Sequence, residues 1–236
     1  MISFFGLMIK KPGKLIVIDG TDGSGKATQS KLLLNYLKNK KISYGYFDFP
    51  QYQTSFFGRF IGKFLRGELG NPGNLNSYLI SLPFAVDRWQ ASPKIKKALA
   101  TKKIVICNRY ASSNMAYQVS RVKKEMRYNL FRWLKALEYK EFKIPKEDLV
   151  VFLYVPFTFA QELISKKDAR KYLKGASKDV FEQDLKLLKQ VDQTYLWLLK
   201  QNSHWVKVDC VEENKLLSRE EIHNRIVQTL KSHRYL

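Results

Sequence analysis

Hydrophobic residues along this 236-residue chain alternate between short continuous apolar runs and longer stretches with helical spacing. A short apolar run is typical of a buried strand, whereas apolar residues three and four positions apart indicate an amphipathic helix. The runs predict strands at Leu15–Ile18, Tyr44–Phe49, Ile104–Cys107, Leu149–Val155 and Trp205–Val208. Helices are predicted at 26–40, 55–67, 76–102, 111–138, 157–166, 179–201 and 218–233, with a break at Pro93 in the third.

Strands that alternate with helices favour a parallel sheet with right-handed crossovers and helices on both faces. The chain has no internal repeat and no linker rich in Pro, Gly or Ser. We therefore expect a single α/β domain over residues 1–236, with a doubly wound, five-stranded parallel sheet in three αβα layers. Ligands of such folds bind beyond the carboxyl ends of the strands.

The loop after the first strand carries a phosphate-binding signature. Gly20-x-x-x-x-Gly25-Lys26 stands between a predicted strand and a predicted helix, which is the context that the signature requires. Glycines let backbone N–H groups turn toward one anion, the helix N-terminus favours negative charge, and Lys26 adds a mobile cation. A plain glycine-rich turn would leave Lys26 unexplained. The residues expected to hold a nucleoside triphosphate are Gly20, Thr21, Gly23, Ser24, Gly25, Lys26, Ala27 and Thr28.

Position 27 departs from this signature, which places Ser or Thr there to bind Mg²⁺. Ala27 has no hydroxyl group, and Thr28 follows roughly 100° further round the helix. Thr28 is therefore the loop's candidate metal ligand, although from an altered position.

An aromatic and a cationic residue share one side of the third predicted helix. Phe84 and Arg88 are four positions apart, so Phe84 could stack on a base while Arg88 donates to a ring carbonyl. Core packing of Phe84 and a surface ion pair of Arg88 are the alternative. Earlier in the chain, Pro50 keeps Phe49 extended and ends the second strand.

Polar residues gather directly after the third strand, where a doubly wound sheet binds ligands. Arg109 could hold a phosphate through two parallel hydrogen bonds. Ser113, Asn114, Tyr117 and Gln118 offer groups suited to the edge of a base or sugar. An ordinary N-capped helix is the alternative interpretation of this segment.

Residues 166–178 contain six cations and one acid between two predicted helices. A basic bridge of this kind suggests a lid that closes over a triphosphate, with a mobile surface loop as the alternative. Arg170 is its only arginine and the best candidate for stabilising transition-state charge.

Composition and charge narrow the classes of protein to which the chain can belong. The net charge is +21, but lysines are spread over nearly every segment, which favours a solvated basic surface over a nucleic-acid stripe. No apolar run approaches the roughly 18 residues of a membrane span. Residues 1–13 make a poor signal peptide and are expected to be a disordered leader. Cys107 and Cys210 end buried strands, as reduced thiols of a cytoplasmic protein would.

Together these motifs resemble the thymidylate kinase family, nucleoside monophosphate kinases of the P-loop NTPase fold that make dTDP. The resemblance runs from about residue 14 to the end of the chain. The ordered motifs are Gly20-x-Asp22-x-x-Gly25-Lys26 with Thr28-Gln29, Phe49-Pro50, Phe84-x-x-x-Arg88-Trp89, Asn108-Arg109-Tyr110 and Ala116-Tyr117-Gln118, followed by the basic lid.

The resemblance implies a Mg²⁺-assisted transfer of the γ-phosphoryl group of ATP to dTMP by a homodimer. Lys26, Asp22, Arg109 and Arg170 would be catalytic, and Gly23 in the loop implies that the catalytic arginine comes from the lid. Phe84 would stack on thymine, Arg88 would donate to O4, and Tyr117 would crowd the 2′ position. The implied dTMP contacts are Asp22, Phe49, Pro50, Phe84, Arg88, Arg109, Ser113, Asn114, Tyr117 and Gln118.

Three positions depart from the family pattern: Ala27, Asn108 and Tyr52. Asn108 stands where the family has a carboxylate that helps to organise Mg²⁺, so Asn108 is a candidate metal-site residue with an uncharged oxygen. Tyr52 stands where many relatives have a phosphate-binding arginine. Two other functions stay open: a deoxynucleoside kinase with Asp48 as its base, and a basic nucleotide- or nucleic-acid-binding protein that has lost turnover.

Overall fold

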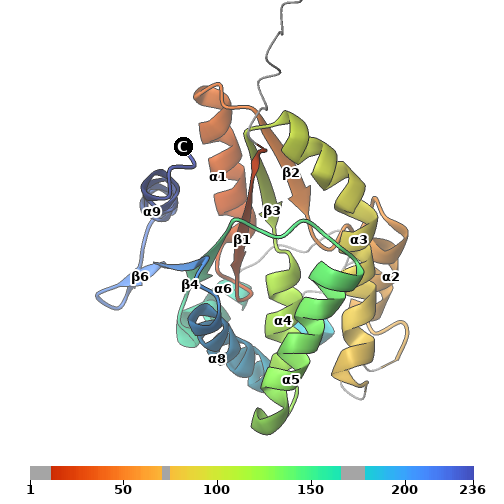
Figure 1. Ribbon diagram of the computed structural model, residues 1–236. Helices are drawn as coiled ribbons and strands as arrows, with labels where there is room; N and C mark the ends of the chain where they lie inside the picture. The colour runs from red at the N-terminus through yellow and green to blue at the C-terminus, as the bar shows by residue number, and fades with distance from the viewer. Residues whose placement is uncertain (1–11, 71–74, 166–178) are drawn as a thin grey trace, which may run out of the picture.

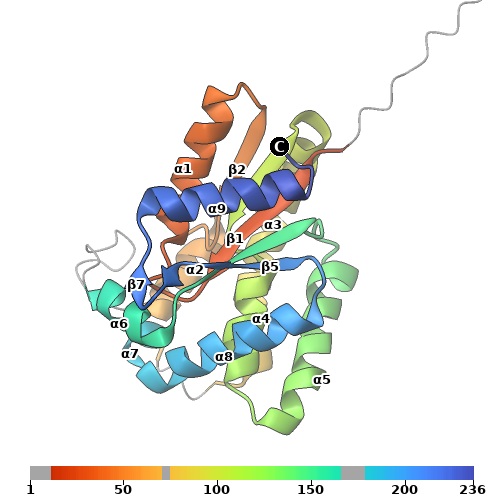
Figure 2. The ribbon, with the colours of Figure 1, turned by 90° about the vertical axis from the view of Figure 1, so that its left-hand side faces the viewer.

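The five predicted strands form one parallel sheet in the computed structural model, which describes residues 12–70, 75–165 and 179–236. The strands lie in the order β2-β3-β1-β4-β5 (Figure 1; β5 is labelled in Figure 2). Their bounds are β1 Lys14–Gly20, β2 Tyr44–Asp48, β3 Ile104–Asn108, β4 Leu149–Tyr154 and β5 Trp205–Asp209. Every neighbouring pair runs parallel, which confirms the doubly wound α/β sheet.

Helices cover both faces of the sheet, and the central strands β3, β1 and β4 are almost entirely buried. Helices α1 (Lys26–Asn39) and α9 (Arg219–Ser232) lie side by side on one face (Figure 2). Helices α3 (Ser77–Thr101), α4 (Ala111–Ser120) and α8 (Leu185–Gln201) cover the other face. Because side chains alternate along a strand, Leu15 and Val17 belong to one core and Ile16 and Ile18 to the other.

Helix α3 runs without a break from Ser77 to Thr101, so the predicted interruption at Pro93 is wrong. A proline inside a helix removes one hydrogen bond and crowds the preceding turn. Pro93 is exposed, so water can reach the carbonyl that it leaves without a partner. Buried residues on both sides of it, Ala91 and Ile95, hold the helix against the sheet.

Two long predicted helices are divided instead. The predicted helix 111–138 is α4 followed by α5 (Lys124–Lys135), which packs against α4, and by a π-helical turn η2 (Ala136–Glu141). The predicted helix 179–201 begins as α7 (Val180–Gln183), and Asp184 then caps α8 by accepting from the N–H of Leu187. A hairpin of β6 (Val211–Glu212) and β7 (Lys215–Leu216) was not predicted.

The remaining helices flank the carboxyl edge of the sheet. Helix α2 (Phe56–Leu65) packs against α3, and α6 (Phe157–Ser165) follows β4. The expected lid, residues 166–178, lies between α6 and α7 and outside the described residues, as do residues 1–11 of the expected leader. None of the described helices is long and apolar enough to cross a membrane.

Candidate functional site

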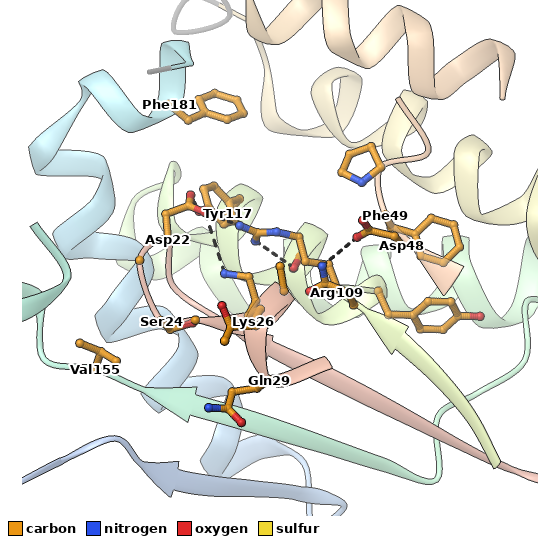
Figure 3. Close-up of a pocket in the computed structure, with 18 of the residues that line it drawn as sticks. Asp22, Ser24, Lys26, Gln29, Asp48, Phe49, Arg109, Tyr117, Val155 and Phe181 are labelled. Carbon is orange, nitrogen blue, oxygen red and sulfur yellow. Dashed lines mark hydrogen bonds and ion pairs between the residues drawn. The ribbon is translucent and has the colours of Figure 1, made fainter. Parts of the chain in front are cut away.

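A cavity of about 830 Å³ opens beyond the carboxyl ends of the strands (Figure 3). It brings together most of the residues that the sequence predicts for the site. Those that line it are Asp22, Gly23, Ser24, Gly25, Lys26, Ala27, Thr28, Phe49, Pro50, Phe84, Arg88, Asn108, Arg109, Ser113, Asn114, Tyr117 and Gln118. Gly20 and Thr21 of the phosphate loop contact Lys26 through their carbonyl oxygens but do not line the cavity, and Arg170 lies outside the described residues.

The phosphate loop curls around the ammonium group of Lys26. Its Nζ donates to the carbonyl oxygens of Gly20 and Thr21, at 3.0 and 2.8 Å, and lies 3.9 Å from a carboxylate oxygen of Asp22. Gly25 starts α1 with φ of 82°, a conformation that strongly favours glycine. The loop thus places a buried cation and the N-terminus of α1 at the same cavity wall, which is an arrangement for binding phosphate.

Arg109 and Tyr117 converge on Asp22 in the centre of the cavity (Figure 3). Arg109 has φ of 61°, so the chain turns sharply from β3 into α4, and its backbone N–H donates to the carbonyl of Ile18 at 3.0 Å. Its guanidinium donates to Asp22 and, at 3.3 Å, to the hydroxyl of Ser113. Burial disfavours the charged form of Arg109, but Asp22 together with Tyr117, Tyr195 and Asp19 outweighs it and raises the pKa well above its usual value. Arg109 is therefore a fixed cation beside the phosphate loop.

Asp19, which belongs to none of the predicted motifs, holds the end of β1 and helices α4 and α8 together by hydrogen bonds. It is fully buried at the end of β1 and accepts hydrogen bonds from the backbone N–H of Gly20 and from the hydroxyl groups of Ser113 and Tyr195, each at 2.8 Å. The hydroxyl of Ser112 donates to its other oxygen. The position of Asp19 directly after an apolar run was visible in the sequence, but its partners on α4 and α8 were not.

Asp48 and Asn108 face each other at the ends of β2 and β3. They are register partners in the sheet, and the Nδ2 group of Asn108 donates to Asp48 at 2.8 Å. The Oδ1 atom of Asn108 is buried without a hydrogen-bond partner among the described residues. Withdrawal from solvent raises the pKa of Asp48, while Asn108 and the charges of Arg109 and Lys26 counteract the shift.

Arg88 contributes to the cavity from α3 and is held by a residue that the sequence did not indicate. Its guanidinium donates to both carboxylate oxygens of Glu138, from Nε at 3.0 Å and also from Nη2. Burial disfavours the charged form of Arg88, but Glu138, with smaller contributions from Asp87 and Tyr110, outweighs it and raises the pKa. The predicted alternative of a surface ion pair is wrong, because Arg88 is 3% exposed and Glu138 is fully buried.

The opposite end of the cavity is apolar and was not predicted. It is lined by Val155 after β4, Leu163 of α6, Leu216 and Leu217 at the hairpin, and Ile222 of α9. Val155 lies at one side of the site and Asp48 and Phe49 at the other (Figure 3). Gln29 joins α9 to the phosphate loop's helix, because its Nε2 group donates to the carbonyl of Arg219 at 2.9 Å. The cavity thus has Phe84 and Arg88 at one end, an apolar lining at the other, and the cations Lys26 and Arg109 between them.

Comparison with known proteins gives one consistent family. The model of the family described as thymidylate kinase matches residues 18–226. A thymidylate kinase of Plasmodium falciparum is 31% identical over 220 residues, covering 93% of this chain and 90% of the relative. A probable thymidylate kinase of Methanocaldococcus jannaschii is 32% identical over 218 residues, covering 92% of this chain and 95% of the relative.

A solved structure agrees in fold. The thymidylate kinase of Candida albicans superimposes with a TM-score of 0.73 at 22% identity, covering 95% of this chain and 93% of the other. The ordered motifs, the sheet and the family model therefore agree. The chain belongs to the thymidylate kinase family.

Proposed function

We propose that this protein transfers the γ-phosphoryl group of ATP to the phosphate of dTMP, which yields dTDP and ADP. One observation carries the proposal: a single cavity is lined by the phosphate loop around Lys26, by Arg109, and by Phe84 with Arg88. A site for a donor phosphate and a site for a nucleoside monophosphate therefore adjoin. Phosphoryl transfer needs mainly positioning and charge neutralisation, which these cations supply.

The acceptor is proposed to bind at the end that contains Phe84 and Arg88. Phe84 lies one helical turn before Arg88 and offers a ring face, while Arg88 offers N–H groups to a carbonyl at C4 of the base. Arg109 would hold the monophosphate next to Lys26. Tyr117, whose hydroxyl donates to Asp22, leaves little room at the 2′ position of a sugar and so favours deoxyribose. Phe49, Pro50, Ser113 and Gln118 would complete this pocket.

ATP is proposed to lie across the phosphate loop with its base at the apolar end. Its phosphates would meet the backbone of Gly23 to Gly25 and the ammonium of Lys26. Val155, Leu217 and Ile222 offer the apolar walls that a purine ring requires. Arg170 is proposed as the lid cation that neutralises transition-state charge, a role that rests on the resemblance alone.

The oxygen donors at the cavity fit a magnesium ion, which binds carboxylate, phosphate and water oxygens. Asn108 has a buried oxygen that no described residue contacts by a hydrogen bond, Asp48 adds a carboxylate beside it, and exposed Thr28 adds a hydroxyl. The described residues contain no group of three or more His, Cys, Asp or Glu that could hold a metal by themselves. Thr28 and Asn108 would therefore share Mg²⁺ with substrate phosphates, and the ion would neutralise phosphate charge.

Two further properties stay predictions. A homodimer is supported by exposed apolar side chains on the adjacent helices α2 and α3, namely Phe56, Phe60, Leu79 and Trp89. A cytoplasmic location is supported by the two cysteines, Cys107 and Cys210, which are both free and buried.

The acceptor separates this function from the two alternatives. Initial rates of ADP formation from ATP and Mg²⁺ are measured with dTMP, with thymidine and without an acceptor. We expect rapid turnover with dTMP and background rates in the other two reactions, because Arg109 binds a phosphate that thymidine lacks. Turnover of thymidine alone would indicate a deoxynucleoside kinase with Asp48 as its base. Nucleotide binding without any turnover would indicate a protein that has lost catalysis.

A further inference from the structure

A single buried carboxylate organises the base end of the cavity. Glu138 is fully buried in the π-helical turn η2, which packs against α3. It accepts from two nitrogens of Arg88 and also from the Nδ2 group of Asn114, at 3.2 Å. Three N–H groups from two different helices, α3 and α4, therefore point at one side chain.

This contact fixes which atom Asn114 offers to a ligand. The second N–H of its Nδ2 group donates to the carbonyl of Ser81 at 3.1 Å. Both amide protons of Asn114 are therefore used, and its Oδ1 atom is buried without a partner among the described residues. Since Asn114 lines the cavity, the atom that remains for a ligand is a hydrogen-bond acceptor.

The same carboxylate fixes the orientation of Arg88. A guanidinium group carries five N–H donors in one plane, and Glu138 occupies the edge formed by Nε and Nη2. The Nη1 group has no hydrogen-bond partner in the described part of the chain, and Arg88 lines the cavity. What remains for a ligand at this position is a donor.

We propose that Glu138 is the positioning residue for base selection, because it fixes a donor at Arg88 and an acceptor at Asn114. A pyrimidine with a carbonyl at C4 and an N–H at N3 matches this pair, as in thymine and uracil. Cytosine presents an amino group at C4 and an unprotonated N3, which reverses both positions. The inference rests on the proposed dTMP site and adds the residue that sets its hydrogen-bond polarity.

The test is Glu138→Gln in the full-length protein, which keeps the size of the side chain and removes its charge. An amide keeps one accepting oxygen and replaces the other with an NH₂ group, which then faces an N–H donor of Arg88 or the donors of both Arg88 and Asn114, so the pair loses its fixed orientation. We expect the KM for dTMP to rise about tenfold, with kcat within about threefold of the wild type. The ratio of kcat/KM for dTMP to that for dCMP should fall about tenfold.

Glu147→Gln is the matched control. Glu147 is also a buried carboxylate and accepts from the hydroxyl of Tyr139 at 2.8 and 2.9 Å, but it does not line the cavity. This variant should retain the dTMP-to-dCMP ratio even where its stability falls. The two variants thus separate a loss of base selection from the general cost of disturbing a buried acid.

The outcomes are distinguishable. A wild-type enzyme that does not prefer dTMP would overturn the proposed function and the role of Glu138 together. A selective wild type with an unchanged ratio in folded Glu138→Gln would overturn the role of Glu138 alone. If Glu138→Gln does not fold, Glu138→Asp decides, because the shorter carboxylate cannot reach both Arg88 and Asn114. A fall of about threefold or more in its ratio is expected, and an unchanged ratio overturns the inference.

Discussion

Asp192 is a buried acid with no hydrogen-bond or ion-pair partner in the described part of the chain. It lies in α8 next to Thr21 and Asp22, and its Oδ1 atom has no hydrogen-bond partner among the described residues. Burial raises its pKa from 3.8 to about 6. The folded state therefore holds a proton that the unfolded state releases near pH 4, and stability attributable to this group falls as the pH rises from about 4 to 6. Above pH 6 the folded protein carries the full cost of a buried charge.

We expect Asp192→Asn to increase the free energy of unfolding, and to do so more at high pH. The gain should be greater at pH 8 than at pH 4 by about 2 kcal/mol, on the order of what the pKa shift implies. Urea unfolding at both pH values measures it. Glu213→Gln, in the exposed hairpin turn, serves as the control and should show no such difference. An equal effect of Asp192→Asn at both pH values would show that the carboxyl group titrates alike in both states.

At the scale of single residues, the sequence predicted one member of each interacting pair but not its partner. The glycine-rich loop indicated Lys26, and the spacing of Phe84 and Arg88 indicated a base site. The partner of Arg88, Glu138, is 50 residues away at the end of a predicted helix and carries no local signal. Asn108 was visible as a lost carboxylate, but the neighbouring carboxylate of Asp48 became visible only when the register of β2 and β3 paired them.

Among the secondary-structure elements, α2 packs through a glycine against the loop that follows Phe49 and Pro50. A Cβ atom added at Gly58 would lie 2.0 Å from the carbonyl oxygen of Gln51, which follows Phe49 and Pro50 at the cavity. Both groups are backbone, so neither can rotate away. The absence of a side chain at Gly58 therefore lets α2 pack directly against the loop that lines the proposed dTMP pocket.

We expect Gly58→Ala to lower the free energy of unfolding by about 1–3 kcal/mol and to raise the KM for dTMP, because α2 and the loop must separate. Gly62→Ala, one turn later, is the matched control. Its added Cβ would lie 3.3 Å from the flexible guanidinium of Arg66, and alanine improves helix propensity by up to about 1 kcal/mol. Thermal unfolding and the KM for dTMP are measured for both variants. Equal behaviour of both variants would argue against the close contact at Gly58.

Element boundaries were predicted less well than the elements themselves. Pro93 does not break α3, because buried neighbours hold the helix on either side of an exposed proline. At 121–123, by contrast, a break occurs that was not predicted: the chain leaves α4 and starts α5 without a glycine or proline. Packing of α5 back against α4 decides that boundary, and local helix propensity does not reveal it.

At the scale of the whole molecule, the strand order explains why distant motifs meet. β1 is central, with β3 on one side and β4 on the other, so the phosphate loop, Arg109 and Val155 all emerge at one edge of the sheet. β2 lies beyond β3 and adds Asp48 and Phe49. The alternation of strands and helices predicted that the segments following the strands would meet at one edge of the sheet. The apolar pocket formed by the hairpin and α9 was not predictable, because it depends on how α9 returns beside α1.

A crystal structure of the full chain with dTMP and ADP tests most directly where the acceptor binds. We predict thymine against Phe84 with O4 within hydrogen-bonding distance of Arg88, N3 near the Oδ1 atom of Asn114, and the monophosphate on Arg109. ADP should place its phosphates on the loop at Lys26 and its adenine near Val155 and Leu217. Thymine at the Val155 end, or a monophosphate remote from Arg109, would contradict the proposed acceptor site.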